Sequence, residues 1–176
     1  MTEPRLLIPY FREAPKFLLQ QRRVFIAGGA VLDLEKATDV DVFVLNCKEF
    51  PALDLIRGHF HLGNQQSTSK SSGGKKRTLI YTKHDMKPIN VICSDSRSIT
   101  ELLEGFDLST SRWAVSVEGK LINVPTSIKP GDPIVVHYVT YKTPERIRKY
   151  GERFGPHRTT GEWVNNSGKD LFDEII

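Results

Sequence analysis

The hydrophobic positions near the N-terminus form two short runs separated by a glycine pair. The runs VFIA and DVDVFVL, residues 24–27 and 39–45, are rich in β-branched and aromatic residues and predict two strands. Between them, Gly28 and Gly29 predict a tight turn, and AVLDLEK, residues 30–36, predicts a short helix. The pattern therefore predicts a strand, a glycine turn, a helix and a second strand.

Four other segments have the character of helices. Residues 10–23 and 48–57 mix apolar and charged positions at helical spacing. Ser98 and Glu101 have the spacing of a capping box, so a helix is expected to begin there. Residues 144–154, PERIRKYGERF, predict a basic helix with a proline in its first turn.

The remaining apolar runs predict strands in pairs. Residues 78–82 and 88–93, TLIYT and PINVIC, flank a turn and predict a hairpin. Residues 112–124 alternate apolar and polar positions about Glu118-Gly119, which predicts a second hairpin. Helices and strands alternate along the chain, so the predicted fold class is α/β or α+β, with a mixed sheet flanked by helices.

One stretch lacks large apolar residues. Residues 63–77, GNQQSTSKSSGGKKR, predict a flexible loop, either a solvated tip or a mobile basic lid that contacts phosphates. With 176 residues, the chain has the size of one domain. We expect that domain to span residues 1–155, followed by a tail at 156–176 that docks as a short helix or is disordered.

Composition narrows the class of protein only a little. A net charge of +4 is consistent with an anionic partner such as a nucleotide or nucleic acid. No apolar stretch is long enough to cross a membrane, and the proline-interrupted N-terminus does not resemble a secretory signal. Cys47 and Cys93 are far apart and predict buried thiols in a reducing compartment, without a disulfide. We therefore expect a cytoplasmic protein with no membrane partner.

Asp39 and Asp41 are unusual because they flank Val40 at the start of an apolar strand. Side chains alternate along a strand, so the two carboxylates point the same way, roughly 7 Å apart along the backbone. Like charges side by side are costly unless a cation compensates them, and Mg²⁺ prefers carboxylate and phosphate oxygens. Such a pair is also common at a solvated strand end. The preceding glycine pair favours the functional interpretation, because glycine lets a phosphate approach the backbone.

These residues resemble a known superfamily. AGGAVLD followed by DVDVFV is similar to the head of the nucleotidyltransferases, closest to tRNA CCA-adding enzymes and bacterial poly(A) polymerases, whose pattern is GGxVRD and then DIDI. Residues 105–123, GFDLSTSRWAVSVEGKLIN, are similar to that branch's RRDFTINALAYDPDGxLID, and TPERIRKYGERFG is similar to its PLRILRAARFA. The resemblance covers about residues 15–155 and omits the domains that grip tRNA in that branch.

The resemblance implies a catalytic site. Asp39 and Asp41 are the implied ligands of Mg²⁺ or Mn²⁺, and Gly28 and Gly29 are implied to bind the nucleotide. Asp107 aligns with the family's motif aspartate and is a candidate third catalytic acid. Its alternative role is that of a turn residue, and Asp95 is a second candidate for the third acid.

The chain also departs from the family pattern where that family contacts nucleotide or triphosphate. These departures are Leu32, Gly105, Phe106 and Ser111. We expect other cations to replace the lost positive charge in nucleotide binding. The candidates are Arg112, Lys75, Lys76 and Arg77. A further basic cluster either contacts nucleic-acid phosphates or forms a solvated helix face. Its members are Arg146, Arg148, Lys149, Arg153 and Arg158.

Two functions from different classes follow. The first is a metal-dependent nucleotidyltransferase that moves NMP from an NTP to an acceptor, with RNA or tRNA the favoured class. The second is a catalytically inactive module with the same fold that binds nucleic acid or a partner protein. A head of this size is expected to need a partner protein or a second copy of itself to complete the acceptor site.

Overall fold

The computed structural model describes residues 1–13, 23–47, 65–71, 74–81, 85–129 and 131–154, with only the backbone of 65–71, 74–81 and 153–154. Residues 14–22 of the helix predicted over 10–23, the helix predicted over 48–57, and the tail at 156–176 lie outside the described residues. The described elements follow in chain order. They are η1 (Pro4–Leu7), α1 (Ile8–Glu13), β1 (Val24–Ala27), α3 (Gly29–Leu32), β2 (Val40–Val44), β3 (Gln65–Ser71), β4 (Gly74–Tyr81), β5 (Ile89–Cys93), α5 (Ile99–Glu104), η2 (Ser109–Ser111), β6 (Trp113–Ser116), β7 (Leu121–Asn123) and α6 (Thr143–Phe154).

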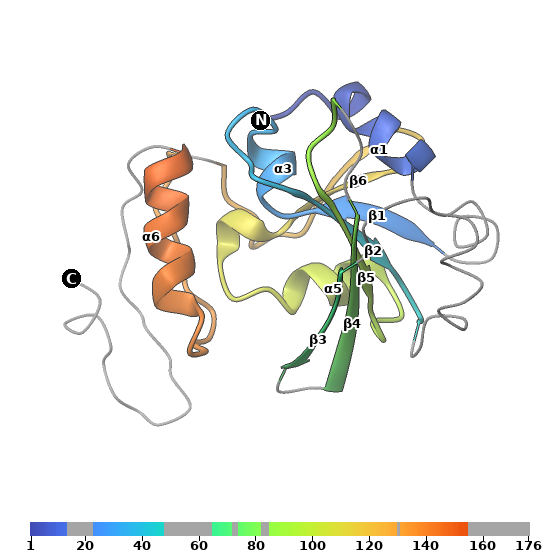
Figure 1. Ribbon diagram of the computed structural model, residues 1–176. Helices are drawn as coiled ribbons and strands as arrows, with labels where there is room; N and C mark the ends of the chain where they lie inside the picture. The colour runs from blue at the N-terminus through green and yellow to red at the C-terminus, as the bar shows by residue number, and fades with distance from the viewer. Residues whose placement is uncertain (14–22, 48–64, 72–73, 82–84, 130, 155–176) are drawn as a thin grey trace.

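The strands form one seven-stranded sheet in the order β3-β4-β5-β2-β1-β6-β7 (Figure 1). β2 and β5 run parallel, and every other neighbouring pair in the sheet is antiparallel. Helices flank this mixed sheet, so the predicted α+β class with a mixed sheet is confirmed. Among the described residues, no helix is both long enough and apolar enough to cross a membrane.

Several local predictions are confirmed. β4 pairs with β5, and β6 with β7, as the two hairpin patterns predicted. The backbone N–H of Glu101 donates to the Ser98 hydroxyl at 3.1 Å, which caps the start of α5. Gly119 has a φ of +80° in the turn before β7, a conformation that favours glycine.

The stretch predicted to be a flexible loop is instead a β-hairpin. β3 and β4 pair in register from Gln65 opposite Ile80 to Ser71 opposite Gly74. The prediction was wrong because it relied on the absence of large apolar side chains. A strand also forms when its backbone has a ladder to join, and β5 offers one to the second half of β4, from Thr78 to Tyr81.

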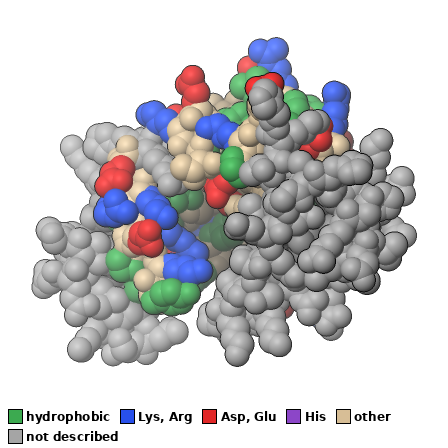
Figure 2. Space-filling view, viewed as in Figure 1, with side chains coloured by type: hydrophobic (Ala, Val, Ile, Leu, Met, Phe, Trp, Pro, Cys, Tyr) green, Lys and Arg blue, Asp and Glu red, His purple; other side chains and the backbone are tan. Residues whose placement is uncertain are grey.

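α6 lies beside the sheet and is held there by a small apolar cluster. Ile147 and Tyr150 of the helix pack against Leu108, Ile134 and Val136 from the preceding segments. Thr143 is fully buried at the start of the helix. Figure 2 shows Lys and Arg side chains gathered on the exposed part of α6.

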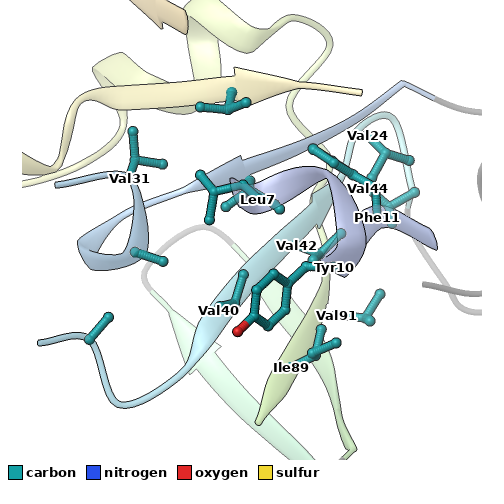
Figure 3. Close-up of a cluster of buried hydrophobic side chains, with 14 of the residues drawn as sticks. Leu7, Tyr10, Phe11, Val24, Val31, Val40, Val42, Val44, Ile89 and Val91 are labelled. Atoms are coloured by element: carbon teal, nitrogen blue, oxygen red, sulfur yellow. The ribbon is translucent and has the colours of Figure 1, made fainter. Parts of the chain in front are cut away.

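The sheet separates two larger cores, and the alternation of β2 divides its side chains between them. Val40, Val42 and Val44 belong to the first core, under the N-terminal helices (Figure 3). Phe43 and Leu45 belong to the second core, which α5 covers. Side chains on one face of a strand are two residues apart, so the second face is also that of Asp41. The aspartate therefore lies at the edge of a core, on an otherwise apolar strand face.

The two cysteines are buried, as predicted, but they are joined. Cys47 and Cys93 form a disulfide with a Cα–Cα distance of 5.2 Å across 46 residues of sequence. The expectation of separate thiols was wrong because Val44 pairs with Cys93, and the chain turns after β2 to bring Cys47 against it. The disulfide ties together the ends of the two parallel strands.

Candidate metal and nucleotide site

The structure places Asp39 and Asp41 at the beginning of β2, in the middle of the sheet. Asp39 precedes the strand and Asp41 is its second residue, and both are partly buried. On one side Asp41 pairs with Ala27, at the end of β1. On the other side it pairs in parallel with Asn90 of β5. The acid pair is therefore held by strands on both sides.

Asn90 connects the two carboxylates. Its side-chain Nδ2 donates to Asp39 Oδ2 at 3.0 Å and to Asp41 Oδ1 at 2.9 Å. One positively polarised nitrogen thus sits where oxygens of both carboxylates converge. Our sequence analysis missed Asn90. The signal was a lone polar residue in the apolar run PINVIC, but its meaning depends on the register of β2 against β5.

Gly28 forms the wall next to Asp41. A Cβ added at Gly28 would lie 3.5 Å from Asp41 Oδ2, and the residue has a φ of +89°. The φ favours glycine at this position, because other residues rarely adopt it, and the distance is an ordinary van der Waals contact that places Gly28 against the carboxylate. Gly29 begins α3, which ends at Leu32 and is shorter than the helix predicted over residues 30–36. The glycine pair therefore lies beside the acid pair, as its order in the sequence indicated.

The electrostatics of the acid pair are unfavourable without a cation. Burial, and then the neighbouring charge of Asp39, raise the pKa of Asp41 from 3.8 to about 6. The hydrogen bond from Asn90 and the positive charge of Arg146 lower this pKa, but by less. The metal-free acid pair therefore disfavours the ionised form of Asp41.

This raised pKa predicts an effect of Asp41→Asn on stability. When a carboxyl group has a higher pKa in the folded protein than in the unfolded chain, the protein loses stability as pH rises between those two values. We expect Asp41→Asn to stabilise the metal-free protein by about 3 kcal/mol at pH 8 and by much less at pH 4. Urea unfolding in EDTA at both pH values measures the difference, and equal effects at the two pH values would contradict this prediction.

Asp107 lies in a different environment. Its side chain is 2% exposed, and its Oδ2 accepts hydrogen bonds from the Thr143 hydroxyl at 2.7 Å and Arg146 Nη1 at 2.8 Å. These contacts tie it to α6. Asp95, the other candidate third acid, is exposed after β5. Within the described part of the chain, no group of three or more His, Cys, Asp or Glu side chains is arranged to hold a metal ion. A third catalytic acid therefore stays a prediction.

Arg112 is used within the chain. Its side chain donates to the carbonyl oxygens of Glu104 and Phe106 and to the hydroxyl of Thr126, and the residue is 5% exposed. These bonds brace the segment between α5 and β6. The geometry therefore favours a structural role for Arg112 over nucleotide binding.

The other predicted cations of the site lie on β4. The backbone of this strand is described, but the side chains are outside the description. They are Lys75, Lys76 and Arg77.

A cavity lies away from the acid pair. It has a volume of about 670 Å³ and is lined by the N-terminal residues, the segment after α3 and the segment before β5. None of the candidate site residues lines it. Tyr10 and Leu32, which do line it, belong to the first core, whereas Asp41 lies on the opposite face of β2.

Comparisons with known proteins are sparse. No protein-family model matches the chain, and no curated protein matches it significantly. Among solved structures, the chain is similar to one described as the complex structure of CCA-adding enzyme with CTP, at 20% sequence identity and a TM-score of 0.39. The match covers 66% of this chain and 30% of that one, so this chain corresponds to less than a third of that protein. A likeness this distant concerns the fold at most and says nothing about activity.

Proposed function

We propose that this protein is a metal-dependent nucleotidyltransferase that transfers NMP from an NTP to an acceptor, with RNA or tRNA the favoured acceptor. The observation that carries the proposal is that the carboxylates of Asp39 and Asp41 converge on one atom. An oxygen of Asp39 lies 3.0 Å, and an oxygen of Asp41 lies 2.9 Å, from the side-chain nitrogen of Asn90. Burial and the charge of Asp39 raise the pKa of Asp41, and a bound divalent ion would offset this cost of ionising Asp41.

The donor set fits Mg²⁺ or Mn²⁺. Both ions prefer oxygen ligands, and Mg²⁺ commonly takes one or two carboxylates with the remainder from water and phosphates. When bound, such an ion neutralises charge that develops on phosphoryl oxygens. Asp39 and Asp41 would hold it, and the Asn90 amide would have to turn its nitrogen away and present its oxygen. Gly28 would keep the space beside Asp41 clear for the phosphates.

The chain's own residues set the geometry of the reaction. The pairing of β2 with β1 and β5 sets the position of Asp41, and the Asn90 amide donates to both Asp39 and Asp41. Asp107 anchors the start of α6 through Thr143 and Arg146. In the transfer step the acceptor hydroxyl attacks the α-phosphorus, its proton leaves to solvent or a nearby base, and the bond to pyrophosphate breaks.

A second candidate function is an inactive module that binds nucleic acid or a partner protein. One observation favours it: Asn90 already donates to both carboxylates, so the pair is partly satisfied without a metal. Such a protein would bind no NTP in a metal-dependent way.

Transfer of label separates the two functions. We expect purified protein with Mg²⁺ or Mn²⁺, each α-phosphate-labelled NTP in turn, and bulk RNA to yield labelled RNA, and EDTA to prevent the labelling. Gel separation of RNA from protein identifies the acceptor class. Absence of label together with absence of metal-dependent NTP binding would favour the inactive module.

A further inference from the structure

Tyr141 lies in the turn immediately before α6 and is strongly exposed. The residue is 83% exposed, the highest value among the exposed large apolar residues that the structure describes, and Leu6 follows at 49%. Single apolar side chains are common on protein surfaces and need no explanation on that ground alone. Tyr141 is distinguished by the turn that holds it and by the charge beside its ring.

The turn that carries Tyr141 is anchored to the buried part of the fold. Thr143 is fully buried, and its hydroxyl donates to the buried Asp107 at 2.7 Å and accepts from the backbone N–H of Thr140 at 2.8 Å. The backbone N–H of Thr143 also donates to the carbonyl oxygen of Thr140, at 3.1 Å. These bonds close the turn on both sides of Tyr141. Its backbone therefore has a fixed position, so a ligand that contacts the ring orders little additional chain.

A positive charge lies beside the ring of Tyr141. The Nζ of Lys142 is 5.5 Å from the ring centroid. Lys142 is exposed, and within the described part of the chain it forms no ion pair, whereas Arg148 and Lys149 each pair with a glutamate of α6. The carbonyl oxygen of Lys142 accepts from the backbone N–H of Arg146 at 3.1 Å, so Lys142 adjoins the first turn of the helix. Lys142 thus extends the basic side chains of α6 (Figure 2) to the aromatic ring.

We propose that Tyr141 and Lys142 form a binding surface for an unpaired nucleic-acid strand, with a base stacked on the tyrosine ring and the adjacent phosphate against the lysine. Proteins bind single strands by combining aromatic rings with cations, because every base has a flat face and every nucleotide carries a negative charge. An unpaired strand fits this surface better than a duplex, whose bases already stack on one another. It also fits better than a protein partner, since charged residues are depleted at the centre of protein interfaces.

This surface and the acid pair are held by different parts of the fold. The turn of Tyr141 is tied through Thr143 to Asp107. The acid pair is held by the strand pairing of β2 and by Asn90. The inference rests on the proposed function for the role of the strand as acceptor, whereas the binding itself needs neither an NTP nor a metal ion.

Fluorescence anisotropy of a fluorescein-labelled oligouridylate of about 12 nucleotides, with the full chain in EDTA and without NTP, tests the inference. Tyr141→Ala should raise the Kd for this strand about 5- to 100-fold, the loss expected when one base loses its stacking partner. Tyr141→Phe keeps the ring, so its Kd should stay within about threefold of the parent value. Leu6→Ala is the matched control, because it truncates another exposed apolar side chain, and its Kd should stay within about twofold.

Salt dependence separates the contribution of the ring from that of the charge. Log Kd changes linearly with the logarithm of salt concentration, and each phosphate contact on a single strand contributes about 0.7 to the slope. Lys142→Gln should therefore lower the slope by about 0.7, whereas Tyr141→Ala should leave the slope unchanged and weaken binding at every salt concentration. For an RNA duplex of the same length, Tyr141→Ala should change the Kd by less than about twofold.

Loss of folding does not explain the expected losses of binding. Both side chains are exposed, so Tyr141→Ala and Lys142→Gln should melt within about 2 °C of the parent protein. Parent-like binding of the unpaired strand by folded Tyr141→Ala would overturn the inference and leave the ring as a contact for a protein partner. Equal losses for the unpaired strand and the duplex would also overturn it, because a contact that does not depend on stacking would explain them.

The two proposals fail in different ways. If Tyr141→Ala weakens binding of the strand but no NTP yields labelled product, the transferase proposal fails and the strand-binding surface stands. If label is transferred while Tyr141→Ala binds the strand like the parent, the transferase stands and the inference about Tyr141 fails.

Discussion

Asp39→Asn/Asp41→Asn is expected to abolish metal-dependent transfer, with a loss of at least about 10³-fold in rate. The reason is that asparagine keeps the shape of each side chain but removes the charges that hold a divalent cation. The fold should survive, because an asparagine oxygen can still accept the hydrogen bonds that Asn90 donates to the pair. Initial rates of labelled NMP transfer, measured over a range of Mn²⁺ concentrations, give the size of the loss.

The matched control for this variant is Asp132→Asn, which neutralises an exposed carboxylate outside the site. Its transfer rate should equal that of the parent protein. Circular dichroism and melting temperature should show that the double variant is folded, and at neutral pH more stable than the parent in EDTA. Turnover at the parent rate in a folded double variant would exclude the acid pair from catalysis. The transfer would then have to be catalysed elsewhere in the preparation, and the proposed function of this site would fail.

Local patterns in the sequence predicted most of the elements but not how they meet. VFIA and DVDVFVL predicted β1 and β2 because strand residues and a glycine turn lie next to each other in sequence. The cap at Ser98 and the turn at Gly119 were predictable for the same reason, since each depends on a few neighbouring residues. Among the described strands, β3 and the first half of β4 were missed, because their formation depends on a partner strand rather than on their own side chains.

The candidate site was predicted in part. Asp39, Asp41 and Gly28 are close in sequence, and the structure brings them together. Asn90 is 49 residues from Asp41, and only the parallel register of β2 with β5 puts its amide between the carboxylates. The role of Arg112 was equally hidden, because most of its hydrogen bonds go to backbone carbonyls whose positions no pattern of side chains reveals.

The disulfide depends on the same parallel register. Nothing in the spacing of Cys47 and Cys93 indicates that they meet, since they belong to neither a short motif nor one element. Val44 lies opposite Cys93 in the ladder that also puts Asp41 opposite Asn90, and the residues after β2 fold back toward that end of β5. One strand pairing therefore creates both the acid site at one end of β2 and the cross-link at the other.

Reduction of this disulfide is expected to lower the free energy of unfolding by about 4 kcal/mol. In the chain-entropy model, a cross-link across 46 residues restricts the unfolded chain by roughly that amount. For a protein of this size, the melting temperature should fall by about 8–16 °C. Urea unfolding of the full chain with and without a phosphine reductant measures the change. Reduction leaves both side chains in place, so no cavity contributes to the result.

Cys47→Ala/Cys93→Ala provides the control, because its stability should not respond to the reductant at all. Alkylation of denatured, unreduced protein followed by mass measurement should find no free thiol in the parent. Two alkylated thiols, with stability independent of reductant, would contradict the pairing.

Transfer activity offers a second comparison. The ladder of β2 with β5 holds Asp41 opposite Asn90, three residues or roughly 10 Å from the cross-linked end. Where the reduced protein remains folded, its transfer rate should therefore stay within about twofold of that of the oxidised protein. This result would mean that the disulfide affects the stability of the fold, whereas the acid pair affects the rate of transfer.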